Sequence, residues 1–371
     1  MDESRAARRD QAGMKDSIYQ YQPLTRAIEA IVLAGGSEQR EAKLVAENLV
    51  LANLLGHDSH GIGMIPRYIA ALLEGGLAAN AHPRVNLDAG ALLALDGCKG
   101  YGQVIGHEAM EMAIERAAKH GSCVMTLGNS HHLGRIGHWA EMAVARGFVS
   151  IHFVNVISHA RVAPYGGRDA RFGTNPCCIG VPLPGEAPFL LDYATSAVAQ
   201  GKLRVAHNKG VKVPPGRLID DVGEATDDPR YAVVPPYGAM LTFGEHKGYG
   251  MALACELLGG ALSGGGTWHY DESSKQRVLN GMLAIVIDPV KLGTADAFAR
   301  EARLFLDWLR KGRPAPGVDK VRLAGEPERE LRAKREREGV PVDATTWEEI
   351  LGAADKVKLP RARVEALAEG R

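Results

Sequence analysis

The spacing of apolar residues near the N-terminus predicts two helices joined by a short polar loop. From Ser37 to Leu55 apolar side chains recur every three or four positions, behind a serine suited to cap the helix. A second helix is predicted to begin at Pro66 and to end at Gly75, because proline favours the first turn and glycine the end. The loop between the two helices has the sequence HDSHG.

The middle of the chain alternates strand patterns with helix patterns. The runs ALLALDG, SCVMTLG and VSIHFVNV have the apolar character of buried strands, and HEAMEMAIERAAKHG and RIGHWAEMAVARG between them have helical spacing. A helix from about His246 to Leu262 and the strand MLAIVID follow. This alternation predicts an α/β fold.

The C-terminal part returns to helical patterns, and its last pair of helices is predicted to open with a capping box, Thr345-x-x-Glu348. We therefore expect an α/β core over residues 89–317 and a helical domain formed by residues 17–88 together with 318–371. Residues 1–16 carry charges of both signs and no apolar run, so we expect a disordered extension and no secretion signal.

Composition narrows the classes of function. Lysine plus arginine equals aspartate plus glutamate, at 44 each, which argues against binding to nucleic acid or to an anionic membrane surface. No apolar stretch reaches the roughly 18 residues that a membrane span needs. The five cysteines show no C-x-x-C spacing, which argues against a disulfide framework and a structural zinc site. We expect a cytoplasmic protein with a small-molecule substrate.

A glycine motif, Gly100-Tyr101-Gly102 with Gly106 beyond it, follows a predicted strand and opens a helix. The glycine fingerprint of dinucleotide-binding Rossmann folds lies in the same context. Here the spacing is wrong by one residue, and the next strand lacks the acidic residue that would hold the ribose. We interpret the motif as a turn between a strand and a helix.

The HDSHG loop places two imidazoles, a carboxylate and a hydroxyl just beyond a helix C-terminus. The negative end of the helix and Asp58 favour an imidazolium, which suits proton transfer. The alternative is that these polar groups only satisfy the free carbonyls of the helix end. A motif this short leaves both readings open.

A second pair of histidines, His131 and His132, lies in the string NSHHLG, between a predicted strand and a helix expected to begin near Arg135. Proteins of the α/β class place ligands at such strand ends, where helix N-termini supply free N–H groups. Adjacent histidines cannot both face one site, so at most one is expected to act. A structural turn histidine is the alternative.

Three further segments carry polar groups at predicted element ends. GTNP at residues 173–176 and DYATS at residues 192–196 have the composition of turns. HKGYG at residues 246–250 opens a helix with glycines and a lysine beside free N–H groups, which suits an anion such as a pyrophosphate or a carboxylate.

Taken together and in this order, DSHG, NSHHLG, FGTNP, LDYATSAVAQGK and HKGYGMALACELLGGALSGG closely resemble the malate/L-lactate dehydrogenase family of the sulfolactate dehydrogenase-like type. The strings GHDSHGIGMIPRY, GRIGHWAE and RFGTNP look most like the branch called hydroxycarboxylate dehydrogenase B. The resemblance implies a non-Rossmann α/β fold, in which a central mixed-sheet cofactor domain accompanies a helical domain formed by both termini. It also implies a homodimer that reduces 2-keto acids to 2-hydroxy acids with NAD, or NADP, as cofactor.

The resemblance further implies roles for particular residues. His60 is similar to the family histidine that gives a proton to the keto oxygen, and His132 corresponds to the second active-site histidine. Ser59 would hold His60 or substrate, and Asp192 would orient an imidazole. The segments that match the family's contacts with the nicotinamide cofactor contain Gly173, Thr174, Asn175, His246, Lys247, Gly325 and Glu326.

One position departs from the family pattern. Many members have an arginine five residues after the serine of SHG, suited to clamp a substrate carboxylate, whereas this chain has Met64. The carboxylate must then meet another cation, such as Arg67 or Arg161, or backbone N–H groups. The apolar side chain favours a bulkier acid, such as phenylpyruvate or hydroxyphenylpyruvate, and activity of the malate or lactate type on small acids is the alternative.

Two other classes of function compete with this reading. A metal-dependent hydrolase or lyase would use as ligands His57, Asp58, His60, His131 and His132, since imidazole and carboxylate suit zinc or iron. The sequence has neither H-x-x-x-H nor C-x-x-C to support it, and we expect no metal. A catalytically silent binding protein is disfavoured because both family histidines remain.

Overall fold

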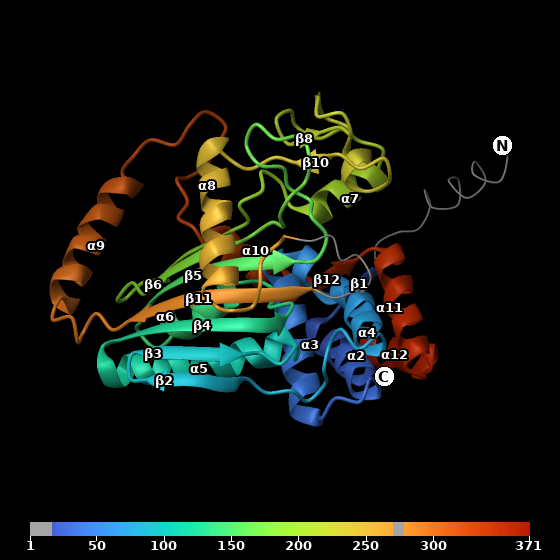
Figure 1. Cartoon of the computed structure of the whole chain (residues 1–371), viewed down its shortest axis with the longest axis horizontal. Helices are drawn as coiled ribbons and strands as arrows, with labels where there is room; N and C mark the ends of the chain where they lie inside the picture. Colours follow the sequence, from blue (N-terminus) through green and yellow to red (C-terminus); the bar gives the residue numbers. More distant parts are fainter. Residues whose placement is uncertain (1–16, 270–277) are drawn as a thin grey trace. The chain divides into compact units, whose positions relative to one another are not determined.

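The computed structural model describes residues 17–269 and 278–371, so the extension predicted at residues 1–16 lies outside the described residues. By its internal contacts the chain divides into two compact units, which can be followed by colour in Figure 1. One contains residues 17–75 and the chain from Glu328 onward, and we call it the terminal unit. The other, Gly76–Pro327, we call the sheet unit.

The terminal unit is mainly helical, and its helices pack through the apolar faces that the sequence pattern predicts, with Leu24, Ile28, Ile31 and Leu49 fully buried. One short antiparallel pair, β1 with β12, joins the two ends of the chain. The elements are β1 (Ser17–Tyr19), α2 (Tyr21–Ala34), α3 (Gln39–Leu54), η2 (Asp58–His60), η3 (Ile62–Met64), α4 (Ile65–Leu73), most of α10 (Glu326–Glu338), β12 (Val340–Val342), α11 (Ala344–Lys356) and α12 (Arg361–Ala368).

Two predicted helix caps in this unit are wrong. The N-cap of α3 is Glu38, while the Ser37 hydroxyl donates to the Glu41 carboxylate over 2.7 Å. The N-cap of α11 is Asp343, whose carboxylate accepts from the backbone N–H of Thr346 at 2.9 Å. An aspartate two residues before the predicted cap satisfies the free donors of this helix, and so displaces the predicted capping box.

The sheet unit contains a seven-stranded mixed sheet in the order β2-β3-β4-β11-β5-β6-β7. Only β3 and β4 are parallel, and the other neighbouring pairs are antiparallel. The predicted α/β fold with a central mixed sheet is therefore confirmed. The strands are β2 (Arg84–Ala89), β3 (Leu92–Asp96), β4 (Ser122–His131), β5 (Val149–Ile157), β6 (Cys177–Val181), β7 (Phe189–Tyr193) and β11 (Leu279–Ile287).

Helices cover both faces of this sheet (Figure 1). On one face, α5 (Gly102–His120) and α6 (Gly137–Val144) bury a core that includes Met125, Val154 and Met282. On the other, α8 (His246–Cys255) continues into a π-helix, η5 (Glu256–Ala261), which packs on β5 and β11. The remaining helices are α7 (Gln200–Asn208), η4 (Pro229–Ala232) and α9 (Ala295–Arg310).

A second, smaller sheet lies within the same unit. Its strands are β8 (Leu218–Ile219), β9 (Ala225–Thr226) and β10 (Ala239–Met240), in the order β10-β8-β9. It shares an apolar cluster with α7 and α8 that includes Leu203, Met240 and Ala252. This arrangement holds the residues that precede α8 in place.

The boundaries of the units differ from those predicted. Residues 84–88, expected in the helical domain, form most of β2 and pair with β3 in the sheet. At the other end the chain stays with the sheet beyond residue 317, because the Ala324 carbonyl accepts from the Leu190 N–H on β7 at 3.2 Å. Among the described residues, no helix combines the length and the apolar character that a bilayer crossing requires.

Candidate active site

The HDSHG loop belongs to the terminal unit, where it forms a turn directly after α3. Gly56 ends the helix with a φ of +82°, and a Cβ on it would lie 2.5 Å from Leu331, so only glycine fits this turn. Asp58, Ser59 and His60 then form the short 3-10 turn η2. Ser59 and His60 therefore lie just past a helix C-terminus, as the sequence predicts.

Asp58 is the anchor of this turn. Arg335 on α10 donates to both carboxylate oxygens, at 2.7 and 3.1 Å, and the Asn53 amide donates to one of them at 2.7 Å. The side-chain oxygen of Asn53 in turn accepts from the backbone N–H of Ile62 at 2.8 Å. Ser59 and His60 thus lie between two residues, Asp58 and Ile62, that are tethered by hydrogen bonds.

Gly61 is required at its position because a Cβ there would lie 2.1 Å from the Asn53 side-chain oxygen. Asn53 and Arg335 anchor the turn, and the sequence analysis did not single them out. Asn53 is a buried polar residue on an otherwise apolar stretch of α3, and this pattern is visible in the sequence. Arg335 lies in a helix so rich in charges that nothing in the sequence distinguishes it.

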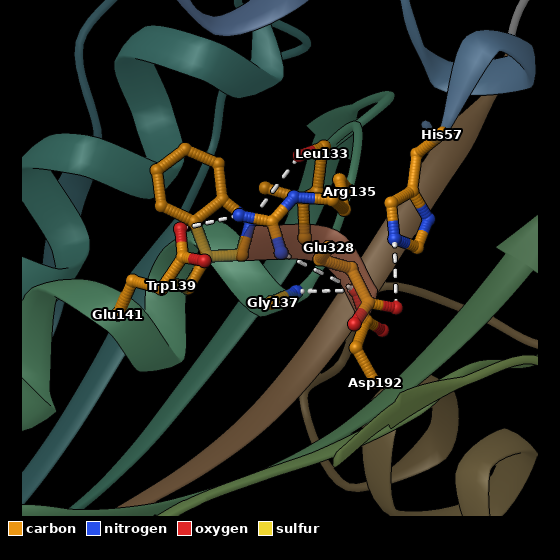
Figure 2. A network of polar contacts seen from close by, with 8 residues as sticks. All are labelled: His57, Leu133, Arg135, Gly137, Trp139, Glu141, Asp192 and Glu328. Carbon is orange, nitrogen blue, oxygen red and sulfur yellow. Dashed lines mark hydrogen bonds and ion pairs between the residues drawn. The ribbon is translucent and has the colours of Figure 1, made fainter. Parts of the chain in front are cut away.

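The other imidazole of the loop, His57, lies 3.7 Å from the Glu328 carboxylate (Figure 2).

The NSHHLG segment belongs to the sheet unit, and β4 extends into it as far as His131. The glycine motif packs against it: a Cβ on Gly102 would lie 2.1 Å from the His132 carbonyl oxygen, and one on Gly106 would lie 2.6 Å from Trp139. Gly102 and Gly106 lie in α5 and allow close packing between chain segments, and the motif connects β3 to α5, as predicted. His132 itself is 9% exposed, at the point where β4 ends.

The residue after His132 is fixed from two sides. The backbone N–H of Leu133 donates to the Asn280 side-chain oxygen at 2.8 Å, and its carbonyl accepts from the Trp139 indole N–H at 3.2 Å. Because Asn280 lies on β11, in the middle of the sheet, these two bonds position the end of the histidine motif against the sheet core.

Asp192, at the end of β7, interacts with the start of α6 (Figure 2). Its Oδ2 accepts from the backbone N–H of Gly137 at 2.8 Å and lies 4.0 Å from an Nη1 of Arg135. Arg135 is 2% exposed and also pairs with Glu141. Asp192 therefore caps α6 and neutralises a buried guanidinium, contacts that differ from the predicted orientation of an imidazole.

The FGTNP loop and the start of α8 are brought together by one buried hydroxyl residue of the DYATS segment, Thr195. Its Oγ1 donates to the carbonyl oxygens of Thr174 and Asn175, both at 3.0 Å, and its own carbonyl accepts from the Phe243 N–H at 3.0 Å. Three of the predicted segments thus form one connected structure within the sheet unit.

Among the predicted cofactor residues, those on α8 are the most accessible. His246 and Lys247 are exposed at the N-terminus of this helix, where the helix dipole and the lysine ammonium suit an anionic group such as a phosphate. Gly325 adopts a φ of +91° directly before α10, and Glu326 lies 3.8 Å from Lys320. Asn175 is fully buried, so its contribution to a ligand would be through the loop that it shapes.

Burial controls the protonation of several groups in the sheet unit. Burial lowers the pKa of His138 to about 3, and the charges of Arg135 and His107 act in the same direction. Burial alone lowers the pKa of His152 to about 3. Burial also raises the pKa of the Cys177 and Cys178 thiols, so both remain protonated and unreactive near neutral pH.

The side chains proposed for a metal-dependent hydrolase do not form a ligand set. Within either unit, as far as the chain is described, no three histidine, cysteine, aspartate or glutamate side chains are grouped closely enough to hold an ion. Asp58 is instead committed to Arg335 and Asn53. The hydrolase alternative therefore has no support from this geometry.

Comparison with known proteins gives a consistent result. Residues 19–351 match the family model described as malate/L-lactate dehydrogenase. Hydroxycarboxylate dehydrogenase B of Escherichia coli K12 is 48% identical over 350 residues, which cover 94% of this chain and 96% of that protein. L-Lactate dehydrogenase of Cupriavidus necator is 43% identical over 292 residues, 78% of this chain and 84% of the relative.

Among solved structures, sulfolactate dehydrogenase of Methanocaldococcus jannaschii superimposes with a TM-score of 0.82 at 31% identity, covering 94% of this chain and 99% of the other. The matches extend over both units and include all of the motif strings that suggested the resemblance. The chain therefore belongs to the malate/L-lactate dehydrogenase family, whose members are 2-hydroxy acid oxidoreductases that use a nicotinamide cofactor.

Proposed function

We propose that this protein is a hydroxycarboxylate dehydrogenase that interconverts 2-keto acids and 2-hydroxy acids. The reaction class follows from membership of the family. Relatives of this protein are named for their action on hydroxycarboxylate, lactate and sulfolactate. The single observation that supports this residue assignment is the HDSHG turn, in which Asn53 and Arg335 hold the backbone around a half-buried His60. A proton donor held in this way loses little entropy when it acts.

The assignment of roles follows the family motifs. A bound nicotinamide cofactor supplies the hydride that reaches the keto carbon. His60 delivers the proton to the keto oxygen, Ser59 holds His60 or the substrate, and His132 stabilises the negative charge that develops on that oxygen. For Asp192 we propose the role that the family motif implies, the orientation of an imidazole; its contacts with Gly137 and Arg135 fix its own position.

For the cofactor, we propose contacts with the backbone of the loop that contains Gly173, Thr174 and Asn175, with the N-terminus of α8, and with residues 325–326. The exposed Lys247 and the positive end of the α8 dipole suit a pyrophosphate or a phosphate. We propose NAD as the preferred cofactor, with NADP as the alternative.

For the substrate, we propose a bulky acid such as phenylpyruvate or hydroxyphenylpyruvate. Met64, at the end of the η3 turn, puts a half-buried apolar side chain where many relatives have a carboxylate-binding arginine. Arg67 or Arg161, or backbone N–H groups, would then bind the substrate carboxylate. Activity of the malate or lactate type on small acids is the alternative.

Steady-state assays of NADH and NADPH oxidation with phenylpyruvate, pyruvate and oxaloacetate test both the proposed activity and the proposed substrate preference. We expect kcat/KM to be highest with phenylpyruvate, and the M64R variant to shift the preference toward oxaloacetate. A strong preference of the wild type for oxaloacetate would refute the aromatic substrate. Failure to reduce any 2-keto acid with either cofactor would refute the activity itself.

We also propose that the protein acts as a homodimer in the cytoplasm, as its family resemblance implies. Neutral overall charge and the composition described above fit that setting. Light scattering coupled to gel filtration measures the oligomeric state. A mass of about 40 kDa, close to the 39.7 kDa of one chain, would contradict the homodimer.

A further inference from the structure

A buried carboxylate in the sheet unit has no role in the chemistry proposed above. Glu256 is the first residue of the π-helix η5 and is 9% exposed. π-Helical turns are rare and frequently occur near functional sites. Here the turn lies against the centre of the sheet, because Gly259 and Gly260 let its backbone approach β5 and β11: a Cβ on Gly260 would lie 2.4 Å from the Asn155 amide.

The Glu256 carboxylate is surrounded by N–H donors. One oxygen accepts from the Asn175 amide at 2.8 Å, and the other accepts from the backbone N–H of Trp268 at 2.8 Å and, over a longer 3.4 Å, from the Asn155 amide. A buried carboxylate needs such partners, because its transfer out of water is otherwise costly. The orientation of the Asn175 amide is fixed as well, since its oxygen accepts from the Val156 N–H at 3.1 Å.

From Glu256 a continuous series of hydrogen bonds leads to the histidine motif. The Asn155 side-chain oxygen accepts from the Gly281 N–H at 2.8 Å, and the Asn155 carbonyl accepts from the Asn280 amide at 2.9 Å. The Asn280 oxygen accepts from the Leu133 N–H, next to His132, at 2.8 Å. Asn155, Asn175 and Asn280 are each at most 3% exposed, so water hardly competes for these bonds.

We propose that Glu256 is a positioning residue that fixes the FGTNP loop through Asn175 and links this loop, through Asn155 and Asn280, to the end of the NSHHLG motif. The inference rests on the proposed function, because that function assigns the loop to the cofactor and His132 to the reaction. Its consequence is that the cofactor-binding backbone is shaped before the cofactor arrives, so that binding loses little free energy to loop ordering.

The E256Q variant tests this role. A glutamine has one acceptor oxygen, so its NH2 group must face either the Asn175 amide or the Trp268 N–H, and the fixed orientation of Asn175 prevents compensation. We expect at least about a fivefold rise in the cofactor Kd and KM, with kcat changed less than about threefold. Hydrogen exchange in the peptide over residues 172–177 should become faster.

The matched control is E111Q. Glu111 on α5 accepts two hydrogen bonds from Arg146 at the surface, so this variant makes the same chemical change outside the buried series. Its cofactor KM should stay within about twofold of the wild type. E256D, which keeps the charge but shortens the side chain, should raise the cofactor Kd less than E256Q does.

An unchanged cofactor Kd in folded E256Q would overturn the inference, and a loss of thermal stability alone would mean that Glu256 has only a structural role. If neither Glu256 variant folds, hydrogen exchange of the wild type tests the positioning role instead. Addition of NADH should slow exchange over residues 252–257, and unchanged exchange there would contradict the proposal. Failure of the wild type to bind NADH at all would refute the proposed function instead.

Discussion

The HDSHG loop of the terminal unit and the FGTNP loop of the sheet unit are both held by side chains that are distant in sequence, but the contacts differ in kind. The first is anchored by the buried Asn53 amide and by an ion pair in which Arg335 is 14% and Asp58 51% exposed. The second is anchored by Asn175 and Glu256, which are buried. Exposed ion pairs are screened by salt and contribute little free energy, whereas buried hydrogen bonds to a carboxylate are costly to break.

This difference fits the tasks that we propose for the two loops. A loop that delivers a proton must accommodate the substrate, and a partly exposed anchor allows small movements. A loop that binds a large cofactor gains affinity when it is rigid beforehand. Perturbing each loop by itself can therefore show whether the two anchors serve these purposes.

The largest effect is expected from H60A. Loss of the proton donor should lower turnover by at least about a hundredfold, because general acid catalysis is typically worth 10²- to 10⁴-fold. The cofactor Kd should stay within about twofold, since the residues proposed to bind the cofactor are intact. The control is H57A, in the same loop, which loses only the contact with Glu328 and should keep most of its turnover. Near-wild-type turnover of H60A would remove His60 from the mechanism.

Acidification should affect the sheet unit more than the terminal unit. His138 and His152, both in the sheet unit, have folded-state pKa values of about 3, below the 6.5 of an unfolded chain. Their contribution to stability is therefore complete above about pH 6.5 and is lost as the pH falls toward 3. The slope is about 1.4 kcal/mol per pH unit for each histidine.

Native-state hydrogen exchange at pH 7 and pH 5 can measure this difference. Protection in β4 and β5 should fall more steeply with acid than protection in α2 and α11. H152Q removes one titrating group and should reduce the slope in the sheet unit. Equal slopes in the two units would contradict the prediction.

The smallest effect is expected from D58N. The asparagine keeps an acceptor for Asn53 and Arg335 but loses the charge, so turnover should fall only about three- to tenfold and stability by at most about 1 kcal/mol. The ratio of wild-type to D58N turnover should approach one as salt is raised, because salt already weakens the pair in the wild type. A loss as large as that of H60A would show that Asp58 takes part directly in the chemistry.

The sequence predicted the elements whose periodicity is strong, and it failed where a contact depends on distant residues. The α3 helix and the alternation of β3, α5, β4 and α6 follow from local pattern. The position of β11 between β4 and β5 does not, because its partners are separated from it by more than a hundred residues of chain. Single polar residues in apolar runs, such as Asn280 and Glu256, were passed over although they organise the sheet unit.

Within the candidate site, local chemistry suggested that the HDSHG and NSHHLG strings matter, and only the family resemblance separated His60 from His57. The contact of His57 with Glu328 could not be foreseen, since it joins the two ends of the chain. Asp192 lies at the end of β7, as the sequence predicts, but its partners, Gly137 and Arg135, depend on how β7 packs against α6.

The insertion of β11 at the centre of the sheet has a consequence for synthesis of the protein. Until residue 287 has left the ribosome, the facing edges of β4 and β5 cannot acquire the strand that joins them. A ribosome adds about 5–20 residues per second, so nascent chains carry two open strand edges for many seconds. Chaperones that shield such edges during translation should therefore raise the yield of this protein more than the yield of small proteins with local strand pairing.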